Sequence, residues 1–252
     1  IILDTRDVYT SKAEKYARYR WDYATEAIRT IFEITRISNQ SVVADIGAGT
    51  GILTRHFTGK VGHVYVVEPN MEMRSCAENL LENCPQCSFV NGTSEETTLP
   101  DRSVDLITVA QAIHWFKAEP SKAEFLRIIK PGGWLVVLRN YGTDRDLNDA
   151  FGSLHSFVRE RDDSRTVPSP PGKQADYYFA KDAYRKWVFP FELQETWEMY
   201  FGALCSYSVM PEEIDPLYDE VAMKAKTIFD SHSVNGYLTV RGETELILGQ
   251  ID

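Results

Sequence analysis

The sequence predicts an α/β fold in which helices cover both faces of one doubly wound, mostly parallel sheet. Two observations carry this prediction. Short apolar segments alternate with amphipathic ones along most of the chain, and a glycine cluster follows the first apolar run directly. The chain has 252 residues, of which 43% are hydrophobic, so it is long enough to bury one large core. No break in composition divides it, and a single domain is expected.

Each element is expected from its own pattern of apolar residues. Strands are expected at 42–46, 63–67, 87–91, 104–110, 134–140, 184–194 and about 236–249. Helices are expected at 11–37, 51–58, 70–83, 119–130, 148–162, 196–206 and 211–230. These elements divide the domain 1–252 into an N-terminal helical cap (1–40), a cofactor-binding core (41–140) and a substrate-side lid with the last two strands (141–252).

Glycine and proline mark the ends of several elements. Lys130-Pro131-Gly132-Gly133 is expected to end the helix at 119–130 before the next strand begins. Gly242 is expected to mark a bulge or turn in the last strand. The segment Val167-Pro168-Ser169-Pro170-Pro171-Gly172 can form neither a helix nor a central strand, so an exposed excursion or lid is expected there.

The most informative segment is Asp45-Ile46-Gly47-Ala48-Gly49-Thr50-Gly51, which follows the apolar run Val42-Val43-Ala44. Three glycines that alternate with small residues allow a tight turn after a strand and let a ligand approach the backbone closely. A helix that begins after this loop would add free N–H groups. The segment therefore predicts a site for a nucleotide-type cofactor.

Two details favour S-adenosylmethionine over a nicotinamide dinucleotide. The third glycine comes one residue earlier than in the pattern G-x-G-x-x-G. Asp45 precedes the first glycine by two residues, where its charge would repel a pyrophosphate but suits the cationic groups of S-adenosylmethionine. Glu68 ends the apolar run 64–67, at the place where an acidic residue accepts ribose hydroxyls. The spacing thus predicts S-adenosylmethionine as the cofactor.

Over about residues 41–140, several motifs together resemble the class I S-adenosylmethionine-dependent methyltransferases. They are residues 44–51, Val67-Glu68-Pro69-Asn70, 92–96 with 99–101, 104–107 and 129–133. Within that superfamily, residues 111–116 and the lead-in 16–23 resemble the small-molecule, type 11 branch that includes trans-aconitate methyltransferase. The resemblance implies a Rossmann-like sheet of seven strands in the order 3-2-1-4-5-7-6, with the last strand antiparallel, and an enzyme that methylates a small molecule.

The resemblance also implies roles for single residues. Those expected to hold the methionine part and to lie near the reactive methyl are Asp45, Gly47, Ala48, Gly49, Ala110 and Gln111. Those expected around the ribose and adenine are Glu68, Pro69, Met71, Ser94 and Glu95. Tyr16, Tyr19 and Arg20 are expected to close over the cofactor or the acceptor. The family often has proline after this arginine, whereas this chain has Trp21, which leaves the local turn open.

The acceptor itself is expected to be small, and O-methylation of a carboxylate or a hydroxyl is favoured over N- or C-methylation. His114 is the one histidine in the strand-end motif and the expected general base, with orientation of the acceptor as its alternative role. Aromatic side chains would line the acceptor pocket, although for each of them a place in the core is the more frequent outcome. They include Trp21, Trp115, Trp197 and Tyr207.

Composition excludes several other classes. The net charge of −10 disfavours a nucleic-acid substrate. No apolar run is long enough to span a bilayer and no apolar N-terminal signal is visible, so no membrane partner and a cytoplasmic location are expected. Cys84-Pro85-Gln86-Cys87 has the spacing of redox and zinc sites but lacks a second pair, so reduced thiols and no metal are expected.

Two other interpretations stay open. A catalytically idle domain would keep the same glycine loop and bind the cofactor as a scaffold. A nicotinamide-dependent oxidoreductase is the closest enzymatic alternative, since Tyr177 and Lys181 have the spacing of a short-chain dehydrogenase pair. The sequence does not indicate an oligomeric state.

Overall fold

The computed structural model describes residues 10–162, 172–180 and 183–251. Most of the proline-rich segment expected as an excursion lies outside these residues, and so does Lys181 of the dehydrogenase-like pair.

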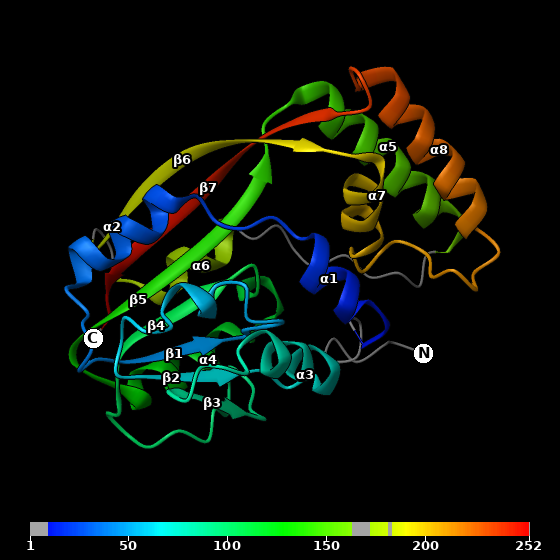
Figure 1. Ribbon diagram of the computed structural model, residues 1–252. Coiled ribbons are helices and arrows are strands. Elements are labelled where there is room, and N and C mark those ends of the chain that lie inside the picture. Colours follow the sequence, from blue (N-terminus) through cyan, green and yellow to red (C-terminus); the bar gives the residue numbers. More distant parts are fainter. Residues whose placement is uncertain (1–9, 163–171, 181–182, 252) are drawn as a thin grey trace. The chain divides into compact units, whose positions relative to one another are not determined.

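One mixed sheet of seven strands organises the chain, in the order β3-β2-β1-β4-β5-β7-β6 (Figure 1). This is the order that the resemblance implies. The strands are β1 Val42–Ile46, β2 His63–Val67, β3 Cys87–Val90, β4 Val104–Ala110, β5 Ile129–Gly142, β6 Tyr184–Glu195 and β7 Leu238–Gln250.

Four neighbouring pairs of strands, from β3 to β5, are parallel. The last strand, β7, is antiparallel to β5, because Asn140 bonds Thr244 whereas the later residue Thr143 bonds the earlier residue Arg241. Figure 1 shows β7 running against β6 in the same way. The expectation of an antiparallel last strand is confirmed.

The helices follow the strands closely in sequence. The α-helices are α1 Ala13–Tyr19, α2 Thr25–Thr35, α3 Met71–Leu80, α4 Ala118–Ile128, α5 Arg145–Arg161, α6 Gly172–Tyr178, α7 Trp197–Cys205 and α8 Tyr218–His232. Short 3-10 turns occur at η1 Thr10–Lys12, η2 Thr54–His56 and η3 Ile113–Trp115. Within the described residues, no helix combines the length and the apolar character that crossing a bilayer requires.

The chain forms two compact units that exchange segments along the sequence. Unit 1 contains Ile1–Trp21, Tyr141–Val167 and Pro190–Glu243, and unit 2 contains Asp22–Asn140, Pro168–Phe189 and Thr244–Asp252. The strands β5, β6 and β7 each pass from one unit into the other, whereas β1 to β4 lie wholly in unit 2.

Unit 2 has a core on each face of its parallel strands. On one face, Ile46 and Ile107 pack with Phe125 of α4 and Tyr178 of α6, whose rings stack with centroids 5.4 Å apart. These strands are buried on both faces, which explains why their sequences are almost continuously apolar. Successive residues of a strand point to opposite faces of the sheet. Ala44 and Ile46 belong to this core, so Asp45, which lies between them in β1, points to the other face.

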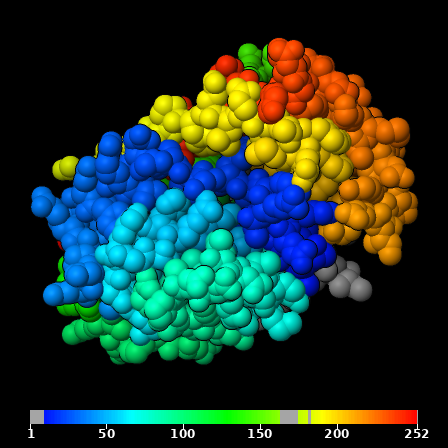
Figure 2. Space-filling view, viewed as in Figure 1, coloured from blue at the N-terminus to red at the C-terminus, as the bar shows by residue number. Residues whose placement is uncertain are grey.

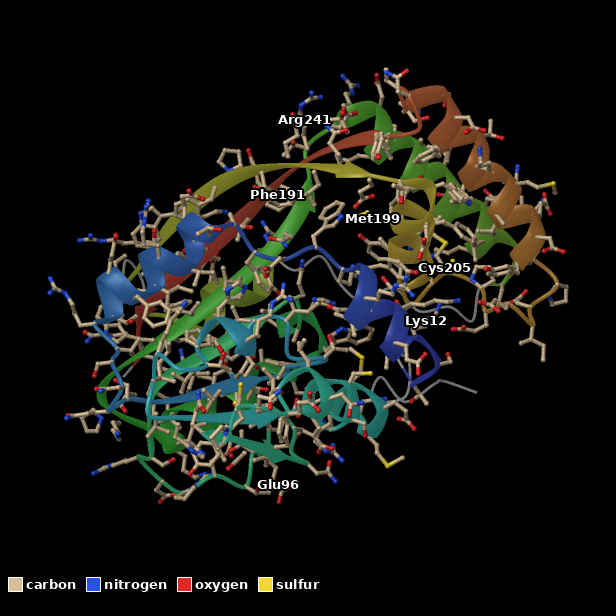
Figure 3. The ribbon with its side chains drawn as sticks, in the orientation of Figure 1. Lys12, Glu96, Phe191, Met199, Cys205 and Arg241 are labelled. Atoms are coloured by element: carbon tan, nitrogen blue, oxygen red, sulfur yellow. The ribbon has the colours of Figure 1, made fainter. Side chains whose placement is uncertain are left out.

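Unit 1 packs α5, α7 and α8 around a second apolar cluster that includes Leu154, Leu204 and Val221. The first turn of the described chain is held to α7 through Lys12, whose buried Nζ donates to the carbonyl oxygens of Cys205 at 3.2 Å and Met210 at 2.6 Å. Figure 3 shows Lys12 and Cys205 near each other in this unit. The amine therefore fixes the N-terminal segment within unit 1.

Gly242, where a bulge or turn is expected, has a packing role. It lies inside the continuous strand β7, and a Cβ built there would come within 2.4 Å of the Phe191 ring. Figure 3 shows Phe191 on β6, beside this strand. Only glycine leaves room for that ring.

Three expected helix positions were wrong. The expected helix 51–58 is a series of turns with one 3-10 turn, η2. The single helix expected at 11–37 is two helices separated by extended chain at Arg20, where φ is −70° and ψ is 141°. The turn thus forms without the proline that Trp21 replaces. The segment Lys130-Pro131-Gly132-Gly133 does not separate a helix from a strand, because β5 begins at Ile129 and includes it.

Candidate cofactor and acceptor site

The glycine loop leaves β1 in the conformation that its sequence predicts. Gly47, Gly49 and Gly51 have φ angles of 67°, 57° and 81°, in the left-handed region that side chains disfavour. A Cβ on Gly47 would lie 2.8 Å from Cβ of Ala112 and 3.2 Å from the ring of Phe116. The loop is therefore packed closely against the segment that follows β4.

Backbone hydrogen bonds hold the loop against the end of β2. The N–H groups of Gly47 and Ala48 both donate to the carbonyl oxygen of Val67, at 2.9 and 3.1 Å. The N–H of Gly51 donates to Ala48 at 3.0 Å. Within the described residues, the Thr50 hydroxyl is buried in this loop without a hydrogen-bond partner. An orphan hydroxyl of this kind is a sign of a site that is completed by a water or a ligand.

Asp45 lies beneath the loop and is 1% exposed. Its two carboxylate oxygens accept hydrogen bonds from the hydroxyls of Thr54, at 2.6 Å, and Thr108, at 2.8 Å. Burial raises the pKa of Asp45 to about 6, and the two hydroxyls oppose that shift only in part. The geometry gives Asp45 a supporting position, since it ties the entrance and the exit of the loop together.

Glu68 ends β2 and faces the loop. Its carboxylate accepts the N–H of Gly49 and the N–H of Asn70, both at 2.9 Å. Burial raises the pKa of Glu68, and these two N–H groups and Arg74 oppose the shift. Glu68 therefore lies beside the glycine loop, and a carboxylate oxygen can accept further donors. Its predicted role as the acceptor of the ribose hydroxyls stays a prediction.

The start of α3 lies directly after Glu68. Asn70 caps this helix, because its side chain accepts the N–H of Met73 at 2.9 Å. Met71, predicted beside the adenine together with Pro69, has a side chain that is 63% exposed. An exposed thioether beside an acidic residue fits contact with a flat ring.

The loop that follows β3 is joined to the start of α4. Glu95 accepts the N–H of Lys117, the N-cap residue of α4, at 2.9 Å, and Ser121 of α4 donates to the buried Ser94 at 2.9 Å. Burial alone would raise the pKa of Glu95, but hydrogen bonds from the N–H of Lys117 and from the side chains of Thr93 and Ser94 outweigh it and leave the pKa lowered. The Ser94 hydroxyl is thus engaged within the protein.

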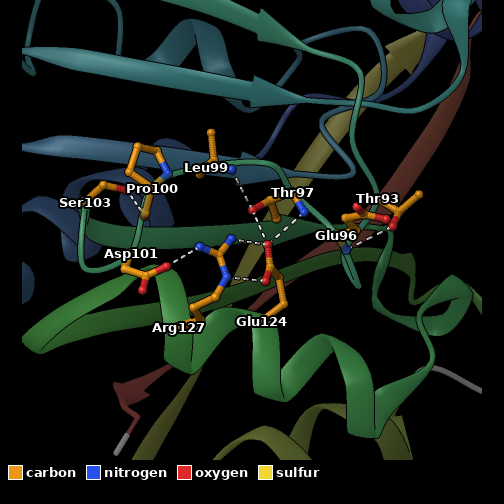
Figure 4. Close-up of polar contacts among 9 residues, drawn as sticks. All are labelled: Thr93, Glu96, Thr97, Leu99, Pro100, Asp101, Ser103, Glu124 and Arg127. Carbon is orange, nitrogen blue, oxygen red and sulfur yellow. Dashed lines mark hydrogen bonds and ion pairs between the residues drawn. The ribbon is translucent and has the colours of Figure 1, made fainter.

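A charged cluster holds the same loop in place from its other end (Figure 4). The N–H and the hydroxyl of Thr97 both donate to the carboxylate of Glu124 on α4. Arg127 donates to both oxygens of Glu124 and to Asp101. Four polar side chains therefore fix the loop that carries Ser94 and Glu95 onto α4.

The chain turns sharply where β4 ends at Ala110. Gln111 has a φ of 55°, an unfavourable value for a residue with a side chain, and its amide donates to the carbonyl oxygen of Asn140 at 3.1 Å. Such strain is concentrated at functional sites. His114 follows in η3, its ring centroid 5.2 Å from that of Trp115.

Gln111 and His114 border a small cavity. Its volume of about 10 Å³ is roughly what one water molecule needs. Gln111, His114, Arg139 and Glu245 contribute to its wall. Arg139 of β5 and a Lys186 side chain of β6 both pair with the buried carboxylate of Glu245 on β7. The histidine predicted as the base therefore lies beside a charged cluster that the sequence did not reveal.

The other predicted acceptor residues belong to unit 1, where each has partners. Arg20 lies over the rings of Tyr16 and Tyr207, at 4.7 and 3.7 Å from their centroids, and its Nε donates to Ser206. The indole N–H of Trp21 donates to the buried Glu195 at 2.6 Å.

Tyr19 and Trp197 have similar places in unit 1. The Tyr19 ring lies against Gly202, and its hydroxyl donates to Glu198. Trp197 stacks on Phe201 with centroids 4.8 Å apart. Contact of the unit 1 residues with cofactor or acceptor stays a prediction.

Sequence reasoning missed the residues that support this site. Thr54 and Thr108 hold Asp45, yet threonines at those positions carry no motif that would have marked them. Asn70 was open to prediction, because Asn after Glu68-Pro69 and before a helical pattern is a typical N-cap. Cys84 and Cys87 are free thiols, as expected, and the described part of the chain has no cluster of three or more potential metal ligands.

Comparison with known proteins gives a consistent assignment. Residues 44–137 match the family described as "Methyltransferase domain". An uncharacterized methyltransferase of Mycobacterium tuberculosis is 34% identical over 167 residues, which are 64% of this chain and 65% of the relative. A malonyl-[acyl-carrier protein] O-methyltransferase of Brevibacillus brevis is 32% identical over 157 residues, 59% of this chain and 56% of the relative. The chain thus spans slightly less than two thirds of the first of these relatives.

Solved structures agree on the fold. A putative type II methyltransferase from Anaeromyxobacter dehalogenans superposes with a TM-score of 0.64 at 18% identity, covering 92% of this chain and 98% of that one. A methyltransferase from Thiobacillus denitrificans, solved in complex with S-adenosyl-L-homocysteine, gives a TM-score of 0.53 at 14% identity, covering 96% and 97%. Residues 44–137 match a methyltransferase domain, and the strand order and the glycine loop agree with the fold of the class I methyltransferases, a family whose cofactor is S-adenosylmethionine.

Proposed function

We propose that this protein transfers the methyl group of S-adenosylmethionine to a small-molecule acceptor, and that the reaction is O-methylation of a carboxylate or a hydroxyl. The observation that carries the proposal is the junction between the glycine loop and Glu68. There, an acidic side chain from the end of β2 accepts the N–H of Gly49 at 2.9 Å. This arrangement presents an acceptor for ribose hydroxyls beside a backbone that a cofactor can approach closely.

The residues around this junction suit the parts of S-adenosylmethionine. Glu68 would accept the ribose hydroxyls, while Pro69, the exposed Met71, Ser94 and Glu95 would surround the adenine. The loop residues Gly47, Ala48 and Gly49, with Ala110 and Gln111, would hold the methionine part. Asp45 would act through the loop, because both of its oxygens are engaged by threonines. The bound cofactor supplies a methyl group on a positively charged sulfur.

The protein's contribution to such a transfer is mainly alignment. The acceptor oxygen, the methyl carbon and the sulfur must lie in one line, and orientation of this kind can lower a barrier by about 7–11 kcal/mol. A carboxylate acceptor is already ionised, whereas a hydroxyl needs a base. His114 would serve as that base or orient the acceptor, and Trp115 would contact the acceptor's apolar surface. A role for Trp21, Trp197 and Tyr207 in acceptor binding stays a prediction.

Three sources support the acceptor class without naming the acceptor. One relative is, by its name, an O-methyltransferase that acts on a malonyl-[acyl-carrier protein]. The net charge of −10 disfavours a nucleic-acid acceptor. The trans-aconitate-like motif at 111–116 favours a small acid. A cytoplasmic location stays a prediction.

The test is calorimetric titration with S-adenosylmethionine, followed by turnover with a panel of small carboxylic acids, alcohols and amines. We expect cofactor binding in the micromolar range and release of S-adenosylhomocysteine with at least one acid or alcohol. Binding without turnover on any acceptor would favour the idle scaffold. Binding of NADH instead would favour the oxidoreductase.

A further inference from the structure

Asp22, the first residue of unit 2, joins the N-terminal part of the chain to the turn that closes the glycine loop. Its Oδ1 lies 2.7 Å from Nε2 of His56, and its Oδ2 lies 2.7 Å from Nη2 of Arg55. Arg55 and His56 belong to the 3-10 turn η2, which follows the glycine loop. Figure 2 shows the chain around these residues, in light blue, on the visible face. Asp22 therefore contacts the turn that follows the glycine loop through both of its carboxylate oxygens.

The same segment is fixed from two further directions. Asn140, at the end of the part of β5 that lies in unit 2, donates from its amide to the carbonyl oxygen of Asp22 at 2.9 Å. The N–H of Ala24 donates to the hydroxyl of Thr244 at 2.9 Å, and this hydroxyl donates to Asn140 at 2.6 Å. Hydrogen bonds to β5 and β7 therefore hold residues 22–24 in place, and with them the Asp22 side chain that contacts η2.

The turn η2, which Asp22 contacts, also contacts Asp45 through its first residue, Thr54. Thr54 precedes Arg55 and His56 in the same turn, and its hydroxyl donates to Asp45 at 2.6 Å. Asp45 in turn accepts from Thr108 on the neighbouring strand β4. The glycine loop lies between Asp45 and Thr54, so both of its ends are fixed by this chain of contacts.

We propose that Asp22 and His56 are positioning residues for the cofactor: the hydrogen bond between their side chains holds η2, and through Thr54 and Asp45 keeps the glycine loop in its binding conformation. This inference rests on the proposed role of that loop in S-adenosylmethionine binding. If the pair is broken, the loop spends part of its time in other conformations. The apparent dissociation constant is then the intrinsic constant divided by the fraction of molecules that keep the binding conformation. The pair is partly exposed, so a moderate effect is expected.

The test compares Asp22→Asn, His56→Gln and the double variant by calorimetry with S-adenosylmethionine. We expect the dissociation constant to rise about three- to tenfold in each single variant. The double variant should bind no more weakly than Asp22→Asn alone, because Asp22→Asn already weakens the contact with His56 as well as the contact with Arg55. His56→Lys places a cation beside Asp22 and should keep the constant within about twofold of the wild-type value.

A matched control lies at the other end of the parallel strands. Lys130 pairs with Asp105 at 2.8 Å, and both side chains are exposed to a similar degree as the Asp22 and His56 side chains. Lys130→Gln should leave the dissociation constant unchanged. The N–H groups of Gly47, Ala48, Gly49 and Gly51 each donate a hydrogen bond. Their hydrogen exchange should accelerate in Asp22→Asn and not in Lys130→Gln.

The outcomes separate the two proposals. A wild-type protein that does not bind S-adenosylmethionine would overturn the proposed function. A wild-type protein that binds it, with folded Asp22→Asn and His56→Gln variants of equal affinity and equal loop exchange, would overturn only the positioning role. An equal loss of affinity in Lys130→Gln would also overturn it, since the effect would then reflect general destabilisation.

Discussion

Glu68 is the residue on which the cofactor assignment depends most directly. Glu68→Ala removes the acceptor for Gly49 and Asn70 and for the ribose hydroxyls, so we expect S-adenosylmethionine affinity to fall by about 1–3 kcal/mol, roughly five- to 150-fold. Calorimetry measures the change. Glu78→Ala, at an exposed position of α3, is the control and should bind normally. Unchanged affinity in a folded Glu68→Ala protein would remove the residue from the site.

Asp45 makes the stability of the protein depend on pH. Its pKa is raised from 3.8 to about 6, so the folded state binds this proton more tightly than the unfolded state. The contribution of this proton to the free energy of unfolding is complete below about pH 4 and is lost as the pH rises through about 6. At 1.36 kcal/mol per pKa unit, this contribution is at most about 3 kcal/mol. We expect Asp45→Asn to lose this slope, measured by urea unfolding from pH 4 to pH 7. Parallel slopes in both proteins would contradict the assignment.

His114 separates the two classes of acceptor. If the acceptor is a hydroxyl, His114→Ala removes its base and should lower turnover by roughly 10²–10⁴-fold at saturating substrate. If it is a carboxylate, the change should act on acceptor binding and leave maximal turnover within about tenfold. Single-turnover methyl transfer measures both, with His63→Ala on β2 as the control. Identical kinetics and affinity in His114→Ala would exclude the residue from the site.

At the scale of elements, a comparison of Gly47 with Gly59 separates the energetic cost of a left-handed backbone from the cost of a steric clash. Gly47 and Gly59 have φ angles of 67° and 71°, so alanine at either position should cost about 1–2 kcal/mol of backbone strain. Only at Gly47 would the new Cβ also meet Ala112, at 2.8 Å, whereas nothing lies within 4 Å at Gly59. We expect Gly47→Ala to melt lower than Gly59→Ala and to lose S-adenosylmethionine binding. Equal melting temperatures with retained binding would show that the loop adapts.

The strands of the sheet could be predicted because their burial leaves a direct trace in the sequence. The runs at 42–46, 63–67 and 104–110 agree with β1, β2 and β4, which are buried on both faces and therefore almost continuously apolar. The segment 51–58 has apolar residues at helical spacing, but the glycines and Thr54 turn it toward Asp45 instead. Local periodicity does not report such a tertiary contact.

The site was predictable where a residue type is required by the backbone or the ligand, as with the glycines and Glu68. It was not predictable where a side chain supports another from far along the chain. Asp22 and His56 are 34 residues apart, and Asp45 and Thr108 are 63 apart. Their pairing follows from the strand order, which places their segments side by side only after the sheet has formed.

For the whole molecule, the exchange of segments between the two units bears on how the protein unfolds. The chain leaves unit 2 within β5 after Asn140, re-enters unit 1 within β6 at Pro190, and returns to unit 2 within β7 at Thr244. Each of these three strands therefore has residues in both units. Loss of one unit would remove part of each strand, so we expect a single cooperative transition rather than two.

Fluorine NMR of protein labelled with 5-fluorotryptophan can follow Trp197 in unit 1 and Trp134 in unit 2 separately through thermal unfolding. The two signals should disappear at one temperature. Saturating S-adenosylmethionine, at 100 times its dissociation constant, adds about 2.7 kcal/mol to the folded state. For a chain of this size that corresponds to about 5–11 °C, and both signals should move by the same amount although the predicted cofactor loop lies in unit 2 alone. A shift confined to Trp134 would mean that the shared strands break at the boundary and that the units unfold independently.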